Sequence, residues 1–248
     1  SDTLRYGFHT LGFLTSEKIA ELAETEMDSG REYGTYISFG GSGAVDDGVW
    51  LVHNNGEKNE YFKNLSAFKR AAEKAGVPLW TTLLSVGHWR YRTPDIDDIR
   101  WQIYTAVSHG VNGILWFFIY ERDKDSSYRQ APINLFFEKT PLFYILSDEN
   151  RMFLKYYADN FIGARLKRVY HKGKVYADYK EYVNGGIEEL SFTGEYGASL
   201  IVSEFENESG AFVCITNNEQ RDIEHLTGEY KNKKFDEWFA SGQLIVLK

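Results

Sequence analysis

The chain has 248 residues, enough for one large domain or two small ones, and 43% of them are hydrophobic, as in ordinary globular proteins. Its formal charge of −8 argues against a nucleic-acid partner, because phosphate binding needs clustered Lys and Arg. No apolar run approaches the ~20 residues of a membrane span, and the single cysteine, Cys214, excludes an internal disulfide. Aromatic residues make up 16% of the chain, and their rings can fill a core or stack on sugars.

The first residues predict two strand–helix units. A strand within residues 4–14 ends in a loop that contains His9, and an amphipathic helix follows from Ser16 to Gly30. A short strand at 35–39 comes next, and a second helix spans 59–75. His9 follows a strand, where ligands collect in such sheets, and is therefore a candidate substrate contact.

Residues 76–120 are the most informative stretch. An apolar run from Leu79 to Val86 predicts a strand buried on both faces, and it stops at a burst of polar and aromatic residues. In that burst, His88 can donate to a sugar hydroxyl and Trp89 can stack on a sugar ring. The competing interpretation has His88 held by the backbone and Trp89 closing the mouth of a barrel. Arg92 either holds a ligand carboxylate or caps a neighbouring helix end.

A helix and another strand follow. Thr93-Pro94 is a typical helix start, with a hydroxyl N-cap and a proline at the first helical position, and the helix ends near Gly110. A buried strand over residues 113–119 ends at Tyr120 and Glu121. Function in parallel sheets collects where strands end, so Tyr120 is a candidate binding residue and Glu121 a candidate catalytic carboxylate. The alternative for Glu121 is a solvated residue in a run of charges.

The spacing of the hydrophobic residues changes near residue 164 to the period of two that is typical of strands. A long irregular stretch after Tyr120 leads to a helix predicted from Ser147 to Phe161, and beyond it short alternating segments are separated by Gly and Asn. We therefore expect two domains, 1–163 and 164–248, the second a small antiparallel β-sandwich.

The first domain has the pattern of half a barrel. Four strand–helix units of about 40 residues each fit residues 1–163, whereas a complete (β/α)₈ TIM barrel takes about 250 residues. The predicted fold class is thus α/β: a TIM-barrel portion of about four βα units, followed by the β-sandwich. The missing N-terminal half of the barrel is an expected partner. A complete α/β protein with an open four-stranded sheet is the alternative.

The segment RYRTPDIDDIRWQIYTAVSHGVNGILWFFIY, with GVPLWTTLLSVGH before it, resembles glycoside hydrolases of the clan A (β/α)₈-barrel type from Bacteroidetes. Ten residues match the motif as they stand: Arg92, Pro94, Arg100, Trp101, Gln102, Tyr104, Thr105, Ala106, Gly110 and Gly113. The Gly242-Gln243-Leu244 turn fits the β-sandwich that ends such proteins. The likeness spans roughly residues 59–248.

The resemblance implies a glycan substrate and hydrolysis of O-glycosidic bonds at the carboxyl ends of the barrel strands. Retaining hydrolysis needs two carboxyl groups about 5–5.5 Å apart. The stretch matching strand seven, Thr81 to Ser85, carries no carboxylate, and 35–39 lacks the Asp expected near the end of strand six. The alternative function is therefore a non-catalytic carbohydrate-binding relative that has lost its catalytic carboxylates.

The remaining expectations concern metals, cofactors and location. The six histidines show no i, i+4 pair, one cysteine cannot build a zinc site, and Asp46-Asp47 lacks the spacing of a calcium loop. We expect neither a metal nor another cofactor. The sequence contains no signal peptide, and a secreted or periplasmic location is implied by the resemblance alone.

Overall fold

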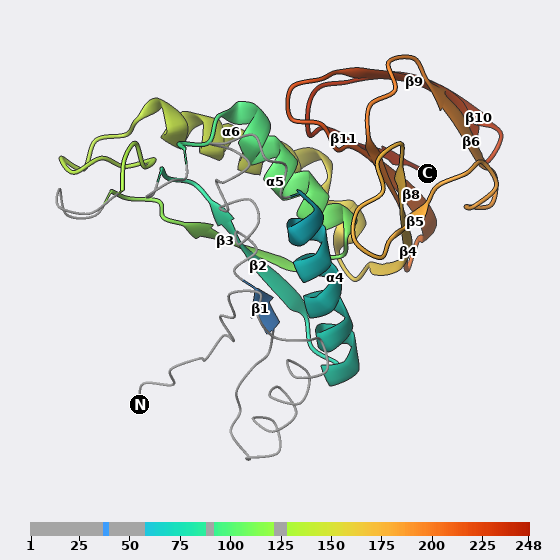
Figure 1. The fold of residues 1–248 in the computed structure, drawn as a ribbon, viewed down its shortest axis with the longest axis horizontal. Coiled ribbons are helices and arrows are strands. Elements are labelled where there is room, and N and C mark those ends of the chain that lie inside the picture. Colours follow the sequence, from blue (N-terminus) through green and yellow to red (C-terminus); the bar gives the residue numbers. More distant parts are fainter. Residues whose placement is uncertain (1–36, 40–57, 88–91, 122–127) are drawn as a thin grey trace.

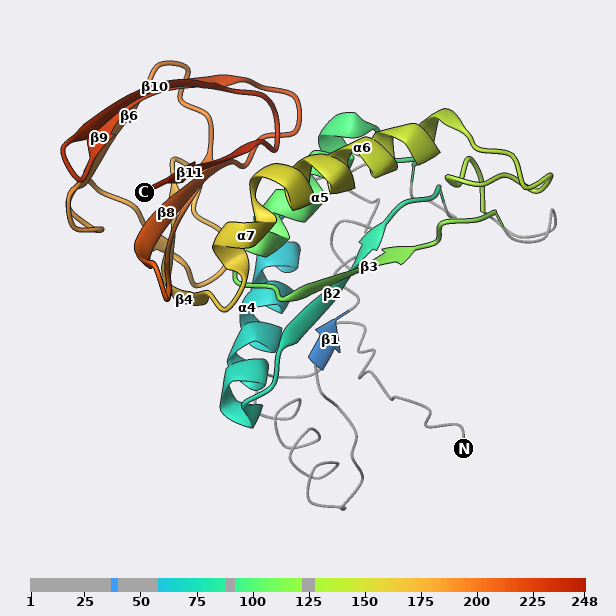
Figure 2. The ribbon, with the colours of Figure 1, turned by 180° about the vertical axis from the view of Figure 1, so that it is seen from behind.

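The computed structural model describes residues 37–39, 58–87, 92–121 and 128–248. These residues form four helices and eleven strands, and the strands make up three sheets (Figure 1). Helices lie between a parallel sheet and a five-stranded sheet, and a three-stranded sheet covers the far side of the five-stranded one (Figures 1 and 2). His9, His88 and Trp89 lie outside the described residues.

The parallel sheet has the strand order β1-β2-β3 and is built from β1 (Ile37–Phe39), β2 (Leu79–Leu84) and β3 (Gly113–Phe117). Parallel strands need a crossover to return to the same end of the sheet. Helix α4 (Lys58–Ala75) precedes β2, and helix α5 (Ile96–Ser108) joins β2 to β3. Both helices were predicted, with boundaries within a few residues.

The start of α5 differs from the prediction by two residues. The N-cap is Asp95, whose Oδ1 accepts from the backbone N–H of Asp98 at 3.1 Å. The Asp98 side chain in turn accepts from the backbone N–H of Asp95 at 3.0 Å, which completes a capping box. The capping box thereby gives hydrogen-bond acceptors to two backbone N–H groups at the start of the helix. A helix start at Thr93-Pro94 would not have formed this pair of bonds.

Two further helices follow a long loop. Helix α6 (Pro141–Tyr156) begins at a proline directly after Thr140, and the short α7 (Ala158–Phe161) continues from it. The predicted start at Ser147 is wrong, because Pro141 at the first helical position is the stronger start signal.

The remaining strands form two sheets. The five-stranded sheet has the order β11-β8-β7-β4-β5 and contains one parallel pair, between β4 and β5. Its strands are β4 (Arg165–Lys172), β5 (Lys180–Glu181), β7 (Leu200–Asn207), β8 (Gly210–Asn217) and β11 (Leu244–Leu247). The antiparallel three-stranded sheet has the order β10-β9-β6, from β6 (Leu190–Gly194), β9 (Glu224–Tyr230) and β10 (Lys233–Phe239).

Strand β8 shows how the layers share their cores. Phe212 and Cys214 face a core that includes α5 and α6, whereas Val213 and Ile215 face the three-stranded sheet. Side chains of a strand alternate between its faces, so this strand is apolar on both. Cys214 is fully buried, and burial raises the pKa of its thiol well above the usual value.

The predicted TIM-barrel portion is wrong. In the part of the chain that the structure describes, three strands are parallel with helical crossovers, and the other eight lie in the mixed and antiparallel sheets. The pattern in 76–120 does form a strand–helix–strand unit, but such a unit also occurs in open sheets. The division predicted at residue 164 falls between α7 and β4 and stays a prediction.

None of the helices in the described ranges combines the length and the apolar character needed to cross a bilayer.

Candidate functional site

The carboxyl ends of β2 and β3 are held side by side. The backbone N–H of Ser85 donates to the Phe117 carbonyl at 2.8 Å, and the Ser85 hydroxyl donates to the Phe118 carbonyl at 3.0 Å. Further on, Gly87 and Arg129 exchange two backbone hydrogen bonds of 3.0 and 2.9 Å. The residues that follow both strands are therefore fixed relative to each other and to the loop at 128–140.

Helix α5 braces the end of β2 through Gln102. The Gln102 side-chain oxygen accepts from the Leu84 N–H at 2.7 Å, and its amide nitrogen donates to the Leu84 carbonyl at 3.1 Å. Both residues are fully buried. Among the described residues, β1 pairs with β2 from Leu79 to Thr81, and Gln102 supplies partners for both backbone groups of Leu84 further along the strand.

Four aromatic rings gather where β3 ends, and we call Phe117, Phe118, Tyr120 and Tyr128 the rim cluster. Phe118 is central, with ring centroids 4.4 Å from Phe117, 5.8 Å from Tyr120 and 5.3 Å from Tyr128. Leu84, at the end of β2, belongs to the buried group on which these phenylalanines pack. Tyr120 keeps 47% of its surface exposed, so the cluster presents one open ring to solvent.

Glu121 follows Tyr120 directly. Its backbone N–H donates to the Ile133 carbonyl at 2.7 Å, and its side chain is partly exposed. Among the described residues that immediately follow β2 and β3, Glu121 is the only carboxylate. Tyr120 and Glu121 thus both follow β3, and because Tyr120 forms a parallel bridge with Ile133, the extended backbone turns successive side chains to opposite faces.

The loop from 128 to 140 is ordered by Asn134, a feature that the sequence analysis missed. Its Oδ1 accepts from the backbone N–H groups of Phe136 and Glu138, both at 2.9 Å. Phe136 and Phe137 are 80% and 89% exposed on this turn. The sequence feature that could have revealed this turn is the pair of adjacent phenylalanines between Asn134 and Glu138.

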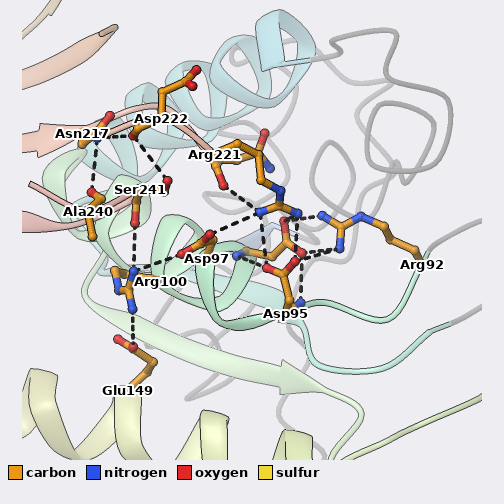
Figure 3. A network of polar contacts seen from close by, with 12 residues as sticks. Arg92, Asp95, Asp97, Arg100, Glu149, Asn217, Arg221, Asp222, Ala240 and Ser241 are labelled. Carbon is orange, nitrogen blue, oxygen red and sulfur yellow. Dashed lines mark hydrogen bonds and ion pairs between the residues drawn. The ribbon is translucent and has the colours of Figure 1, made fainter. Parts of the chain in front are cut away.

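Arg92, predicted in the burst that follows β2, is held at the start of α5 (Figure 3). Its guanidinium donates to Asp98 at 2.5 Å and lies 3.7 Å from Asp95. Asp98 is 1% exposed, and its burial raises the pKa of its carboxyl, while Arg92 acts in the opposite direction. These contacts give Arg92 a structural role at the helix start, and its predicted contact with substrate stays a prediction.

The same network ties α5 to the C-terminal sheets (Figure 3). Arg100 donates to Glu149 of α6 at 3.1 Å and to the Ser241 carbonyl, before β11, at 3.2 Å. Trp101 donates from its indole nitrogen to the Asn218 side chain at 2.9 Å. The motif residues Arg100, Trp101 and Gln102 therefore serve packing between layers.

Across the described residues, no group of three or more His, Cys, Asp or Glu side chains is arranged to hold a metal ion.

Comparison with known proteins gives no family. No protein-family model matches the chain, and a search of curated proteins finds no significant relative.

Proposed function

We propose that the protein binds carbohydrate at the rim cluster, with Tyr120 as the stacking ring and Glu121 as a hydrogen-bond acceptor. The observation that carries this proposal is the half-exposed Tyr120 ring, which contacts Phe118 at 5.8 Å between ring centroids and is followed directly by a carboxylate. Sugars offer an apolar C–H face beside a ring of hydroxyl groups. The Tyr120 ring is complementary to the C–H face, and the carboxylate of the next residue can accept from hydroxyl groups that extend past the ring.

The likeness of residues 76–120 to glycoside hydrolases supports a sugar as the ligand, although the barrel expected from it is absent from the described residues. Binding is favoured over hydrolysis because Glu121 has no second carboxylate beside it at the described ends of β2 and β3. His9, His88 and Trp89 are predicted to add contacts, and a secreted or periplasmic location would suit such a ligand.

Calorimetric titration of the full chain with cellohexaose, xylohexaose, mannohexaose and chitohexaose tests this proposal. Covering about 60 Å² of a tyrosine ring contributes about 1.5 kcal/mol, which corresponds to roughly tenfold in affinity. We therefore expect Tyr120→Ala to weaken binding of the best probe about tenfold. The matched control is Tyr144→Ala, because Tyr144 is 57% exposed on α6, and it should bind as the unchanged protein does. Unchanged affinity in Tyr120→Ala contradicts the proposal, and so does failure of the unchanged protein to bind any probe.

Hydrolysis is the second candidate, and the position of the Glu121 carboxylate at a strand end favours it. Release of nitrophenol from a panel of aryl glycosides would support it if Glu121→Gln abolishes the release. Glu208→Gln, in the exposed turn between β7 and β8, is the control and should leave turnover unchanged. Sugar binding without turnover would leave carbohydrate binding as the function.

A further inference from the structure

The outward face of the three-stranded sheet carries a second group of aromatic and polar side chains. This sheet lies on the side of the C-terminal region that is remote from the parallel sheet (Figures 1 and 2). Cross-strand register places His225 of β9 opposite Trp238 of β10, and Thr227 opposite Asp236. Glu195, just past β6, donates its backbone N–H to the His225 carbonyl at 3.0 Å, which extends the row to a third strand.

His225 is fixed between two carboxylates. Its Nδ1 lies 2.7 Å from a Glu195 oxygen, and its Nε2 lies 2.6 Å from an Asp236 oxygen. Both carboxylates hydrogen-bond to the ring and raise the pKa of His225, so that both ring nitrogens donate in the imidazolium form. Each carboxylate uses one oxygen for this contact, and both carboxylate side chains are more than half exposed.

The imidazole in turn supports an aromatic platform. The rings of His225 and Trp238 are stacked, with centroids 4.4 Å apart and an interplanar angle of 9°. Tyr196 lies beside the indole at 5.8 Å and is tilted by 42°. Stacking on His225 covers one face of the indole, yet Trp238 and Tyr196 keep 54% and 55% of their surfaces exposed. Large aromatic side chains this open on a sheet face are available to a ligand.

A shallow groove continues from this platform along the sheet. It has a volume of about 530 Å³, and its lining includes Asp236 together with the hydroxyl-bearing Thr193 and Thr227. The two threonine hydroxyls lie 3.3 Å apart and form one hydrogen-bonded pair. Donors, acceptors and an aromatic surface thus occur side by side over three strands.

We propose that this face, formed by Glu195, Tyr196, His225, Asp236 and Trp238 with the adjoining threonine groove, is a second carbohydrate-binding site for a neutral oligosaccharide. We call these five residues the sheet-face platform. One sugar stacks on Trp238 and Tyr196, and its hydroxyl groups donate to the outer oxygens of Glu195 and Asp236. The next sugar lies over the threonine hydroxyls in the groove. The site is separate from the rim cluster and does not depend on the function proposed there.

The charges on this face oppose the other ligand classes. The carboxylates of Glu195 and Asp236 repel phosphate, which argues against nucleic acids and phosphorylated ligands. Lys234 also lines the groove, but it lies opposite Glu229 across the strand pair, so the two together add no net positive charge. An added peptide strand pairs with the backbone at a sheet edge, whereas the platform lies on the face. A neutral polyhydroxylated chain needs neither an edge nor a cationic patch.

Nuclear magnetic resonance provides a test that reports on this site alone. The chain has six tryptophans, and the indole N–H signal that disappears in Trp238→Phe identifies Trp238. We expect that signal to shift on titration of the full chain with at least one of the four hexasaccharides named above. Tyr196→Ala should weaken the binding followed at the Trp238 signal about threefold. Trp238→Ala removes that signal, so its effect is measured by calorimetry in a Tyr120→Ala background, where we expect at least a tenfold loss of affinity. Tyr144→Ala is again the matched control and should have no effect.

The outcomes separate the two sites. A shift of the Trp238 signal that persists in Tyr120→Ala supports the sheet-face platform even if the rim cluster binds nothing. An unmoved Trp238 signal with all four probes overturns the platform, whether or not the rim cluster binds. A shift that survives unchanged in a Tyr196→Ala, Asp236→Asn double variant with an unaltered melting temperature also overturns it.

Discussion

The Nε2 atoms of His109 and His171 lie 3.2 Å apart, and both side chains are buried between α5 and β4. His171 Nδ1 accepts from the backbone N–H of Tyr176 at 3.2 Å, so its proton sits on Nε2 and is donated to His109. His109 Nδ1 then carries a proton and donates to the Thr105 carbonyl at 2.7 Å. All four ring nitrogens have partners only while both histidines are neutral.

This pair predicts a loss of stability in mild acid. Burial lowers the pKa of His109 to about 4 and, together with His109 itself, that of His171 to about 2. The unfolded chain therefore binds more protons below its ordinary histidine pKa of about 6.5, and stability falls as the pH drops from there. The slope is about 1.4 kcal/mol per pH unit for each histidine.

Urea unfolding at intervals from pH 7 to pH 5 measures this slope, and His171→Gln should reduce it by up to one proton. The titration of His225 does not produce this loss of stability at low pH. Its folded-state pKa is raised, so its contribution is complete below about 6.5 and is lost only as the pH rises. Equal slopes for the unchanged protein and the variant would contradict the assignment of two neutral histidines.

We expect that breaking the ion pair between Arg100 and Glu149 lowers the free energy of unfolding substantially. Their side chains keep only 16% and 10% of their surfaces exposed, so Arg100→Met leaves a carboxylate desolvated without its partner. We expect a loss of about 3 kcal/mol in the free energy of unfolding. Arg151→Met breaks an exposed pair with Asp148 in the same helix and should cost about 0.5 kcal/mol or less. Similar losses in the two variants would show that the buried pair contributes little.

We expect replacement of Gln102 to destabilise the end of β2 locally. Gln102→Leu removes both partners of the Leu84 backbone, and a buried unsatisfied group costs about 1–3 kcal/mol. We expect a loss of about 2 kcal/mol or more, together with faster hydrogen exchange at the Leu84 amide. Unchanged protection of that amide would mean that another group replaces the glutamine.

Gly242 predicts a packing constraint between α5 and the turn before β11. Its φ is +67°, and a Cβ atom there would lie 2.5 Å from the backbone nitrogen of Trp101. Gly163 has nearly the same φ, +68°, with open space around it. Gly163→Ala should therefore cost about 1 kcal/mol of unfolding free energy from conformation alone. Gly242→Ala should cost at least twice as much in the same urea titration, and equal costs would argue against the close approach.

The individual elements could be predicted better than their assembly. Apolar periodicity located α4, α5, β2 and β3 to within a few residues, because those patterns reflect which face each element buries. Strand β10 lies between the alternating segments predicted at 222–228 and 242–247 and was missed, because the sequence KKFDEWF is charged and exposed at a sheet edge and lacks the expected alternation. That omission also hid Trp238 from the search for sugar-binding aromatics.

The barrel was wrong for a different reason. Local sequence specifies a strand–helix–strand unit, but whether a parallel sheet closes depends on what covers its helices. Here Ile103 and Val107 of α5 share one buried core with Phe212 of β8, which lies more than 100 positions further along the chain. At the candidate site, Tyr120 and Glu121 were found because they directly follow a strand. The contacts of Gln102 with Leu84 and of Phe118 with Tyr120 are tertiary contacts, and the spacing of hydrophobic residues in the sequence carries no information about them.

The burial of β8 on both faces has a practical consequence for recombinant work. A fragment ending near residue 163 would leave Ile103, Val107 and Leu146 facing water, and the complementary fragment would uncover Phe205 and Phe212. We expect each piece expressed alone to collect in inclusion bodies, whereas the two made together in one cell should recover as a soluble pair.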